Sequence, residues 1–386
     1  MKVLLIHNFY TLSGGEDAVF RQEAELLSSK FEVSTLTFRN KEGILGGIQF
    51  LLSIYNIFII QKVNKKIRDF APDLIHIHNF HFAAGPILIR IAKKKKIPLI
   101  ITLHNYRLLC PSTTMTDGDF VYTNSLNKTF PLEAVVKGLY RESRMLTFWL
   151  VLVTWFHYKL GTWGMVDRYL ALTSFSKNLF SSNVIGINPN TILIKPNFVL
   201  DYEGKQPLRL KHFLFVGRLS GEKGIRTLLK SFSKSKLILK VAGKGPLESE
   251  FLKQSQQNSN IISLGALGPS DVRTEMLTCS ALIFPSVWFE GMPMTILEAF
   301  STGTPVIASN LGNMADMIID GYNGLLFKAG DTNDLISKVS YWNSLSTSTQ
   351  NEFSLHARMT YEKEFTPDRN LQMLCNIYDS LYTADA

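Results

Sequence analysis

Two basic residues in the second half of the chain are spaced in a way that suits phosphate chemistry. Arg218 and Lys223 lie in the segment FVGRLSGEKG, where we expect a strand, a flexible loop and then a helix. A guanidinium can grip two oxygens of a diphosphate, and an ammonium beside a helix N-terminus adds a point charge. The alternative is a pair of solvated surface cations, and the spacing is not that of a Walker loop.

Two acidic residues further along could hold hydroxyl groups. Glu290 lies in a loop after an apolar run, and Glu298 follows eight residues later in an expected helix that Gly291 and Pro293 open. Because the neighbours of Glu298 are apolar, we expect its carboxylate to be buried and therefore paired or bound to a ligand. Carboxylates that accept hydrogen bonds from adjacent hydroxyls hold ribose and hexose rings. A structural Glu paired with a local cation is the alternative.

The elements that must position these residues alternate between strand-like and helix-like segments, which predicts parallel sheets covered by helices. One helix is expected over 16–29, after the Gly14-Gly15 turn. The polar segment KPNFVLDYEGKQPLRLK at 195–211 has the composition of a linker between two α/β units. The expected strands are 3–6, 33–37, 74–78, 99–103 and 168–172 in the first half, and 213–216, 237–241, 261–264, 282–285 and 305–308 in the second.

The residues that could do chemistry follow expected strands in both halves. Gly14-Gly15 and His104 follow strands of the first unit, and Arg218 and Glu290 follow strands of the second. Ligands of open α/β sheets bind outside the carboxyl ends of the strands, where loops and helix N-termini gather. If the two sets of strand ends face one another, they form a cleft between the domains.

These motifs resemble family 4 of the retaining glycosyltransferases with the GT-B fold, which carry an E-x7-E signature. The resemblance implies two Rossmann-like domains that face each other across a cleft: residues 1–195 for the acceptor and 196–367 for a nucleotide-sugar donor. Residues 368–386 would form a C-terminal helix that packs back on the first domain. The matching segments are GRLSGEKG, EGMPMTILEA and TPVIAS, with DLIHIHN at 73–79, TLHNYRLLCP at 102–111, ALTSFSKNLF at 171–180 and VAGKGP at 241–246.

The resemblance also implies roles for single residues. Arg218 and Lys223 would hold the donor diphosphate, Glu290 the sugar hydroxyls and Glu298 the donor ribose. His104 would face the donor sugar and the reacting centre, although a buried structural histidine is the alternative. These roles make Arg218, Lys223, Glu290 and His104 the expected catalytic residues. The remaining expected donor-binding positions are Gly14, Gly15, Gly291, Met292, Pro293, Met294 and Thr295, where Gly15 would allow close approach of the phosphates.

We expect no metal and no cofactor, because the nucleotide sugar is a substrate and GT-B enzymes typically need no bound metal. His76, His78 and His81 in HIHNFH superficially suggest a metal cluster, but no carboxylate or cysteine stands near them in the sequence. The segment 117–119, Asp-Gly-Asp, imitates the D-x-D of metal-dependent transferases of another fold. Its Thr- and Gly-bearing surroundings favour a turn.

Composition and charge concern the partners of the chain. The 386 residues are 46% hydrophobic and 19% charged, as in folded proteins, and the net charge of +9 indicates an acidic partner. Three well-separated cysteines favour a reducing cytosol over a disulfide framework. The sequence contains no helix-turn-helix pattern and no basic pattern with interleaved aromatic residues, so we do not expect nucleic acid as a partner.

Two apolar stretches and a basic region raise the question of a membrane. Ile44–Ile60 has no charge over 17 residues, short of the roughly 20 that a spanning helix needs. We expect it to dock on a core or to lie in a membrane interface, and Met145–Phe156 to be a buried or interfacial helix. The basic residues are either a solvated face or an attraction for anionic lipid. They are Lys62, Lys65, Lys66, Arg68 and the run from Lys93 to Lys96.

The motifs predict a hexosyltransferase, cytoplasmic or peripheral at the inner face of the cell membrane, and the family resemblance implies that it retains the anomeric configuration. It would move a hexose or a hexose derivative from a nucleotide sugar to a glycan, with a lipid-linked intermediate of surface polysaccharide biosynthesis as the first acceptor to test. The rival hypotheses are a sugar-nucleotide epimerase or a phosphorylase of similar fold, and a non-catalytic scaffold. The donor base, the sugar, the acceptor and the linkage are not encoded in any motif that we recognise.

Overall fold

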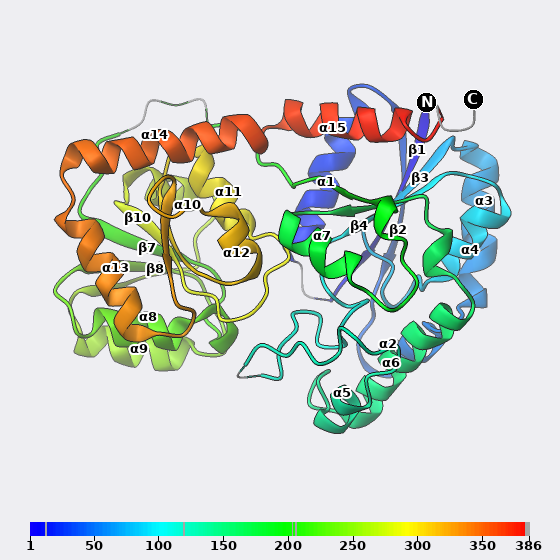
Figure 1. The fold of residues 1–386 in the computed structure, drawn as a ribbon, viewed down its shortest axis with the longest axis horizontal. Helices are drawn as coiled ribbons and strands as arrows, with labels where there is room; N and C mark the ends of the chain where they lie inside the picture. The colour runs from blue at the N-terminus through cyan, green and yellow to red at the C-terminus, as the bar shows by residue number, and fades with distance from the viewer. Residues whose placement is uncertain (12–13, 119, 203, 205–206, 383–386) are drawn as a thin grey trace. The chain divides into compact units, whose positions relative to one another are not determined.

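The computed structural model describes residues 1–11, 14–118, 120–202, 204 and 207–382 (Figure 1). The chain divides into two compact units. The first contains Met1–Asp117, Tyr122–Asn197 and the segment from Asn370 onward, and the second consists mainly of Phe198–Arg369. Each unit has one six-stranded sheet in which paired strands are parallel. The predicted α/β class with two Rossmann-like units is confirmed.

The first sheet has the strand order β2-β1-β3-β4-β5-β6. The neighbouring strands β1, β3 and β4 are mainly aliphatic and buried on both faces, which is typical of a parallel sheet covered by helices. The edge strand β6 was not predicted, because three residues give too short a pattern. The bounds are β1 Lys2–Phe9, β2 Glu32–Arg39, β3 Leu74–Ile77, β4 Leu99–Leu103, β5 Arg168–Ala171 and β6 Ile192–Ile194.

Helices on both sides of this sheet bury its faces. Phe20 and Leu27 of α1 pack against Val3 and Leu5 of β1 in one core cluster, which also contains Tyr378 of the last helix, α15. The predicted return of the C-terminal helix to the first unit is therefore confirmed. The helices are α1 Gly15–Ser28, α2 Gly43–Leu52, α3 Ile60–Phe70, α4 Ile87–Lys94, α5 Leu132–Lys137, α6 Arg144–Lys159, α7 Ser174–Ser181 and α15 Pro367–Asp379, with 3-10 turns η1 Ile57–Ile59, η2 Trp163–Met165 and η3 Pro189–Thr191.

The second sheet has the order β12-β11-β10-β7-β8-β9. Its core includes Phe213, Leu239 and Ile283 from the strands and Phe232 from α8. Strand β12 was not predicted, since its four residues begin with a glycine. The bounds are β7 His212–Val216, η4 Gly221–Lys223, α8 Ile225–Phe232, β8 Ile238–Ala242, α9 Glu248–Gln257, β9 Ile261–Gly265, α10 Pro269–Thr278, β10 Ala281–Phe284, α11 Met294–Ser301, β11 Val306–Ser309, α12 Gly312–Met317, β12 Gly324–Phe327, α13 Thr332–Ser344 and α14 Thr347–Glu364.

The two apolar stretches noted in the sequence behave differently. Helix α6 buries one side, through residues such as Leu150 and Val153, whereas α2 has no buried residue. Among the described residues, no single helix has both the length and the hydropathy of a membrane span. Helix α2 and the following helical segment Ile57–Phe70 reach that threshold only as a pair, and the pair is bent by 93°.

Candidate functional site

The strand order of the second sheet reverses between β7 and β10, and the loops that leave these two strands meet at the carboxyl edge. In α/β sheets this is the place where ligands bind. Lys223, after β7, donates from Nζ to Oε1 of Glu290, after β10, over 2.6 Å. The Lys223 side chain is 23% exposed and that of Glu290 is 10% exposed. Two of the predicted site residues, 67 positions apart, are therefore in contact.

The carboxylate of Glu290 has further donors that fix its direction. Its Oε1 also accepts from Ser286 Oγ at 2.7 Å and from Trp288 Nε1 at 2.7 Å. The Trp288 ring lies 5.3 Å from the Lys223 ammonium, so the same indole orients the carboxylate and faces the cation. Sequence reasoning did not assign Ser286 or Trp288, although both stand within four residues of Glu290 in PSVWFEG.

A third residue that sequence reasoning missed holds the backbone of this loop. Asn313, at the start of α12, donates from Nδ2 to the carbonyl oxygen of Glu290 over 2.8 Å and also contacts that of Gly291. Asn313 is fully buried. Its amide fixes the turn that leads into α11, and no motif around Asn313 signals this contact.

Close packing of the two loops depends on a glycine. Gly224 ends the turn that carries Lys223 and has φ of +73°, in the left-handed region. A Cβ at this position would stand 1.8 Å from the carbonyl oxygen of Pro285, which follows β10. Any side chain here would push the β7 and β10 loops apart, so the Lys223–Glu290 pair requires Gly224.

Arg218 and Glu298 present charges to solvent on the same unit. Arg218 is exposed after the end of β7, and no hydrogen bond or ion pair of its guanidinium occurs within the described ranges. Glu298 is exposed on α11, so the prediction of a buried carboxylate was wrong. The apolar side of α11 faces the core through residues such as Leu297. Adjacent positions in a helix point in different directions, so Glu298 points away from the core. Nearby protein still removes part of its hydration and raises the pKa of Glu298, while Arg273 opposes this shift.

The remaining expected donor-binding residues lie around the first turn of α11. Met292 and Pro293 are buried, whereas Gly291, Met294 and Thr295 are partly exposed. The helix starts at Met294, and its first backbone N–H groups have no partner within the helix. Such N–H groups can receive anionic or hydroxyl oxygens.

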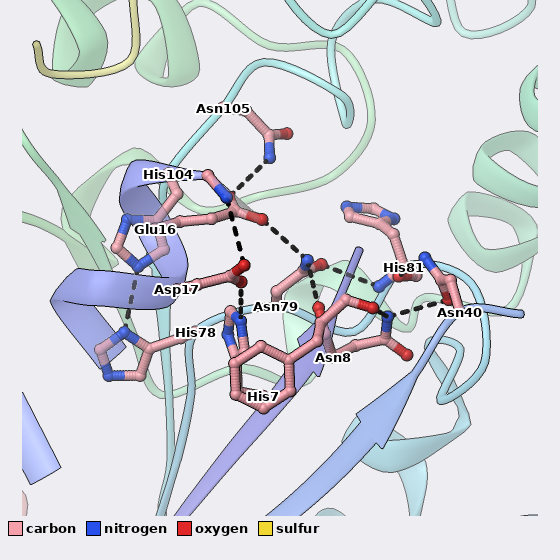
Figure 2. A network of polar contacts seen from close by, with 12 residues as sticks. His7, Asn8, Glu16, Asp17, Asn40, His78, Asn79, His81, His104 and Asn105 are labelled. Atoms are coloured by element: carbon pink, nitrogen blue, oxygen red, sulfur yellow. Dashed lines mark hydrogen bonds and ion pairs between the residues drawn. The ribbon is translucent and has the colours of Figure 1, made fainter. Parts of the chain in front are cut away.

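In the first unit, His104 ends a chain of buried polar groups. It follows β4 and is 9% exposed, and its Nε2 lies 3.0 Å from Nδ1 of His78 (Figure 2). Nε2 of His78 lies 3.1 Å from Oε1 of Glu23, whose other oxygen accepts from the Lys195 ammonium. Glu23 and Lys195 are fully buried, and sequence reasoning assigned neither.

Burial and neighbouring charges change the pKa values of Glu23 and His104. Burial would raise the pKa of Glu23, but Lys195 and His78 outweigh it and hold that pKa well below its usual value. Burial and the adjacent His78 hold the pKa of His104 well below its usual range. A neutral His104 can donate a hydrogen bond from one ring nitrogen and accept one at the other.

The predicted glycines Gly14 and Gly15 are exposed where α1 begins, and acidic side chains follow them. Glu16 accepts from Asn79 Nδ2 at 3.0 Å and from Asn105 Nδ2 at 3.4 Å (Figure 2). Burial and the neighbouring Asp17 raise the pKa of Glu16 to about 7, against the opposing charge of Arg107 and the two amides. Neither Asn105 nor Arg107 was among the residues predicted from the sequence.

The histidine cluster differs from its expected form. The sequence shows no carboxylate nearby, yet the fold brings Glu23 to His76 and His78, with potential ligand atoms within 4.8 Å of one another. His76 already contacts Tyr378 and Thr102 at 2.8 Å each, and the Lys195 ammonium contacts Glu23. A metal cation would compete with these protein contacts and face that ammonium.

The Asp-Gly-Asp segment at 117–119 is only partly described. Asp117 forms an ion pair with Lys137 at 3.0 Å, whereas Asp119 lies outside the described residues. The Asp117 carboxylate therefore has a partner within the first unit.

Comparisons with known proteins agree with this geometry. The profile described as Glycosyltransferase Family 4 matches residues 21–199, and that described as Glycosyl transferases group 1 matches residues 203–360. The chain belongs to the group 1 glycosyltransferases. The matched ranges cover both units, and the second range contains Arg218, Lys223, Glu290 and Glu298.

One relative of this glycosyltransferase has a function in polysaccharide synthesis in its name. O-antigen chain mannosyltransferase C of Escherichia coli is 30% identical over 174 residues, which are 44% of this chain and 46% of the relative. The chain thus spans less than half of that relative's length.

Solved structures share the fold. Anabaena Alr3699/HepE in complex with UDP has a TM-score of 0.70 at 16% identity, over 98% of this chain and 100% of that one. The lipopolysaccharide outer core galactosyltransferase WaaB has a TM-score of 0.64 at 18% identity, over 98% and 99%. At these identities the likeness establishes the GT-B fold of the glycosyltransferase.

Proposed function

We propose that the protein transfers a hexose or hexose derivative, with retention of configuration, from a nucleotide sugar to a glycan acceptor in surface polysaccharide biosynthesis. One observation carries this proposal: the Lys223–Glu290 pair and the exposed Arg218 stand together at the strand reversal of the second sheet. The UDP-bound neighbour and the O-antigen relative support a nucleotide-sugar donor and a polysaccharide product.

The charges of this site match the demands of glycosyl transfer. A nucleotide sugar carries a diphosphate that gains negative charge as the glycosidic bond breaks. Arg218 can take two of its oxygens and Lys223 can supply a point charge, so both stabilise the departing nucleotide. Glu290, oriented by Ser286 and Trp288, accepts hydrogen bonds from sugar hydroxyls. Exposed Glu298 is accessible to a ribose, which its carboxylate could hold in the same way.

Contacts within the protein fix the position of the Lys223 ammonium. Holding the ammonium against Glu290 and near the Trp288 ring fixes it before the donor arrives, so little rotamer freedom is lost on binding. In the first unit, His104 would offer Nδ1 to a substrate hydroxyl. The acceptor proton would pass to an oxygen of the leaving phosphate, which the family resemblance favours.

The test uses matched charge removals on the second unit. Because its guanidinium is exposed, Arg218→Ala should leave the melting temperature nearly unchanged, while kcat falls by about 10²–10³-fold through loss of charge stabilisation. Lys223→Ala should cost similar turnover and also some stability, since Glu290 loses a donor. Lys234→Ala, exposed after α8, is the control and should change neither. Normal turnover in both site variants would reject the proposed site.

Product analysis separates the rival activities. Thermal shift against UDP-, GDP- and ADP-sugars identifies the base, and donor hydrolysis distinguishes an enzyme from a scaffold. An epimerised nucleotide sugar would indicate an epimerase, and dependence on inorganic phosphate would indicate a phosphorylase. With a lipid-linked saccharide as acceptor, the anomeric signal of the product tests retention.

A further inference from the structure

Helix α2 of the first unit exposes aliphatic side chains that no other described element covers. Its outward residues Ile44, Leu45, Ile48 and Leu51 are 47–85% exposed, and their spacing places them on one side of the helix. Gln49 borders this side, and its amide is held by the backbone of Lys41 and Arg39. A helix of this kind normally buries its apolar side, so an exposed one indicates a partner.

The apolar surface continues beyond the end of α2. Tyr55, Ile57 and Phe58 are 42–73% exposed, and no charged residue interrupts residues 43–61. Helix α2 is nevertheless anchored, because Trp149 of α6 donates from Nε1 to the carbonyl oxygen of Phe50 over 2.8 Å. The contact with α6 therefore holds α2 in place while its aliphatic side stays exposed.

A cationic groove borders this surface at Tyr55. The groove has a volume of about 490 Å³ and lies along α3 and α4, which are side by side (Figure 1). Its rim carries Arg90, Lys93, Lys94 and Lys95, and none of the described residues that line it is acidic. Lys93 is 3.7 Å from Asp167, whereas the ammonium groups of Lys94 and Lys95 make no hydrogen bond or ion pair in the described part of the chain.

The floor of the same groove is apolar. Ile60, Ile87, Ile91 and Met165 line it beneath the cationic rim. A ligand that fits has a negatively charged group at one end and hydrocarbon next to it. Phospholipids have this structure, and a leaflet of them would also cover the aliphatic side of α2.

We propose that α2, residues 55–58 and this groove form a docking surface for the anionic phospholipid leaflet of a membrane. Helix α2 lies flat in the interface with its aliphatic side among the acyl chains, and the groove receives a lipid phosphate. The bend of 93° after α2 directs Ile57–Phe70, with its lysines, away from the direction of α2. The aliphatic composition of α2 and the excess of cations fit lipid better than a protein interface, whose core favours aromatic residues.

The proposal goes beyond glycosyl transfer, and its test needs no sugar substrate. Co-sedimentation with vesicles of phosphatidylcholine alone, or mixed with phosphatidylglycerol, is measured at low and high salt. The parent protein should bind only the mixed vesicles, and more weakly at high salt. Lys94→Glu with Lys95→Glu should reduce the partition coefficient by about 25-fold or more, since each lysine near an anionic surface contributes about fivefold.

The apolar part is tested with Ile44→Ser and Ile48→Ser together, which should reduce binding at least about tenfold at both salt concentrations. Matched controls on the second unit are Leu355→Ser with Met359→Ser, and Lys234→Glu with Lys236→Glu, all at exposed positions. The controls should bind like the parent.

Three results would overturn the proposal. One is failure of the parent protein to sediment with the mixed vesicles, and another is an equal loss of binding in the control variants. The third is a change in the sedimentation coefficient of lipid-free protein caused by the α2 substitutions, which would identify the surface as an interface between copies of the chain. Transferase activity could persist through all three outcomes.

Discussion

Replacing Lys195 by Met is the sharpest test of the buried polar chain behind His104. Lys195 and Glu23 are fully buried and 172 positions apart in the sequence, and the ammonium donates to one carboxylate oxygen. Methionine keeps much of the side-chain volume and removes the charge, so the packing of the first unit changes little. The carboxylate of Glu23 then remains buried without its principal partner.

The expected loss is large because the remaining charge is uncompensated. Breaking one partner of a buried pair costs about 3–5 kcal/mol. For a unit of this size each kcal/mol moves the melting temperature by roughly 2–4 °C, so a decrease of roughly 6–20 °C is expected. Removing both charges with Glu23→Gln and Lys195→Met should recover at least half of this loss, since no isolated charge stays buried.

The pH dependence gives an independent check with a defined sign. In the parent, the depressed pKa of Glu23 contributes stability that is present above the ordinary value of 4.5 and is lost as pH falls through the folded value. Without Lys195, burial raises the pKa of Glu23, so the folded variant takes up a proton at this carboxylate more readily. That variant is therefore stabilised at low pH and loses stability as pH rises above 4.5, relative to the parent.

Thermal unfolding of the parent, Lys195→Met and the double variant is measured between pH 5 and about 8. It gives the loss of stability, its recovery in the double variant and the pH dependence. Lys236→Met, at an exposed position, is the control for replacing a lysine by methionine. If Lys195→Met melts within about 2 °C of the parent, or if the double variant is no more stable than the single one, the ion-pair argument is refuted.

Two further predictions concern the edges of the two sheets. Glu16→Gln should flatten the fall in melting temperature between pH 5 and 8, because a carboxyl whose folded pKa is raised to about 7 contributes stability that is lost as pH rises through that value; an unchanged pH profile would contradict the assigned shift. Asn313→Ala should weaken binding of the nucleotide sugar and cost about 1–3 kcal/mol in the free energy of unfolding, because the Glu290 and Gly291 carbonyls lose their hydrogen-bond donor. Calorimetry measures the binding and chemical unfolding measures the stability. An unchanged affinity for the nucleotide sugar would show that the loop does not depend on Asn313.

The sequence predicted the strands with long apolar runs and missed the shortest ones. Leu99–Leu103 was predicted with the bounds that β4 has, and the start of β1 was displaced by one residue. β6 and β12 were not predicted, because three or four residues do not establish a period. They are strands because a neighbouring strand in the sheet supplies the hydrogen bonds.

The motifs around Arg218, Lys223, Glu290 and Glu298 identified the family and the residues to inspect, because they are local in the sequence. The exposure of Glu298 was mispredicted, since the orientation of one helical position depends on which side of α11 the sheet covers.

The sequence by itself determined the α/β class, the two-unit plan and the membership of the glycosyltransferase family. These follow from composition, periodicity and motifs, which are recognisable in short stretches of the sequence without knowledge of the fold. Only the tertiary structure decided that Lys223 meets Glu290 and that Lys195 meets Glu23 and, through it, His78. The Lys223–Glu290 and Lys195–Glu23 contacts join residues 67 and 172 positions apart, and they exist because parallel strands and the helices that cover them bring distant segments together.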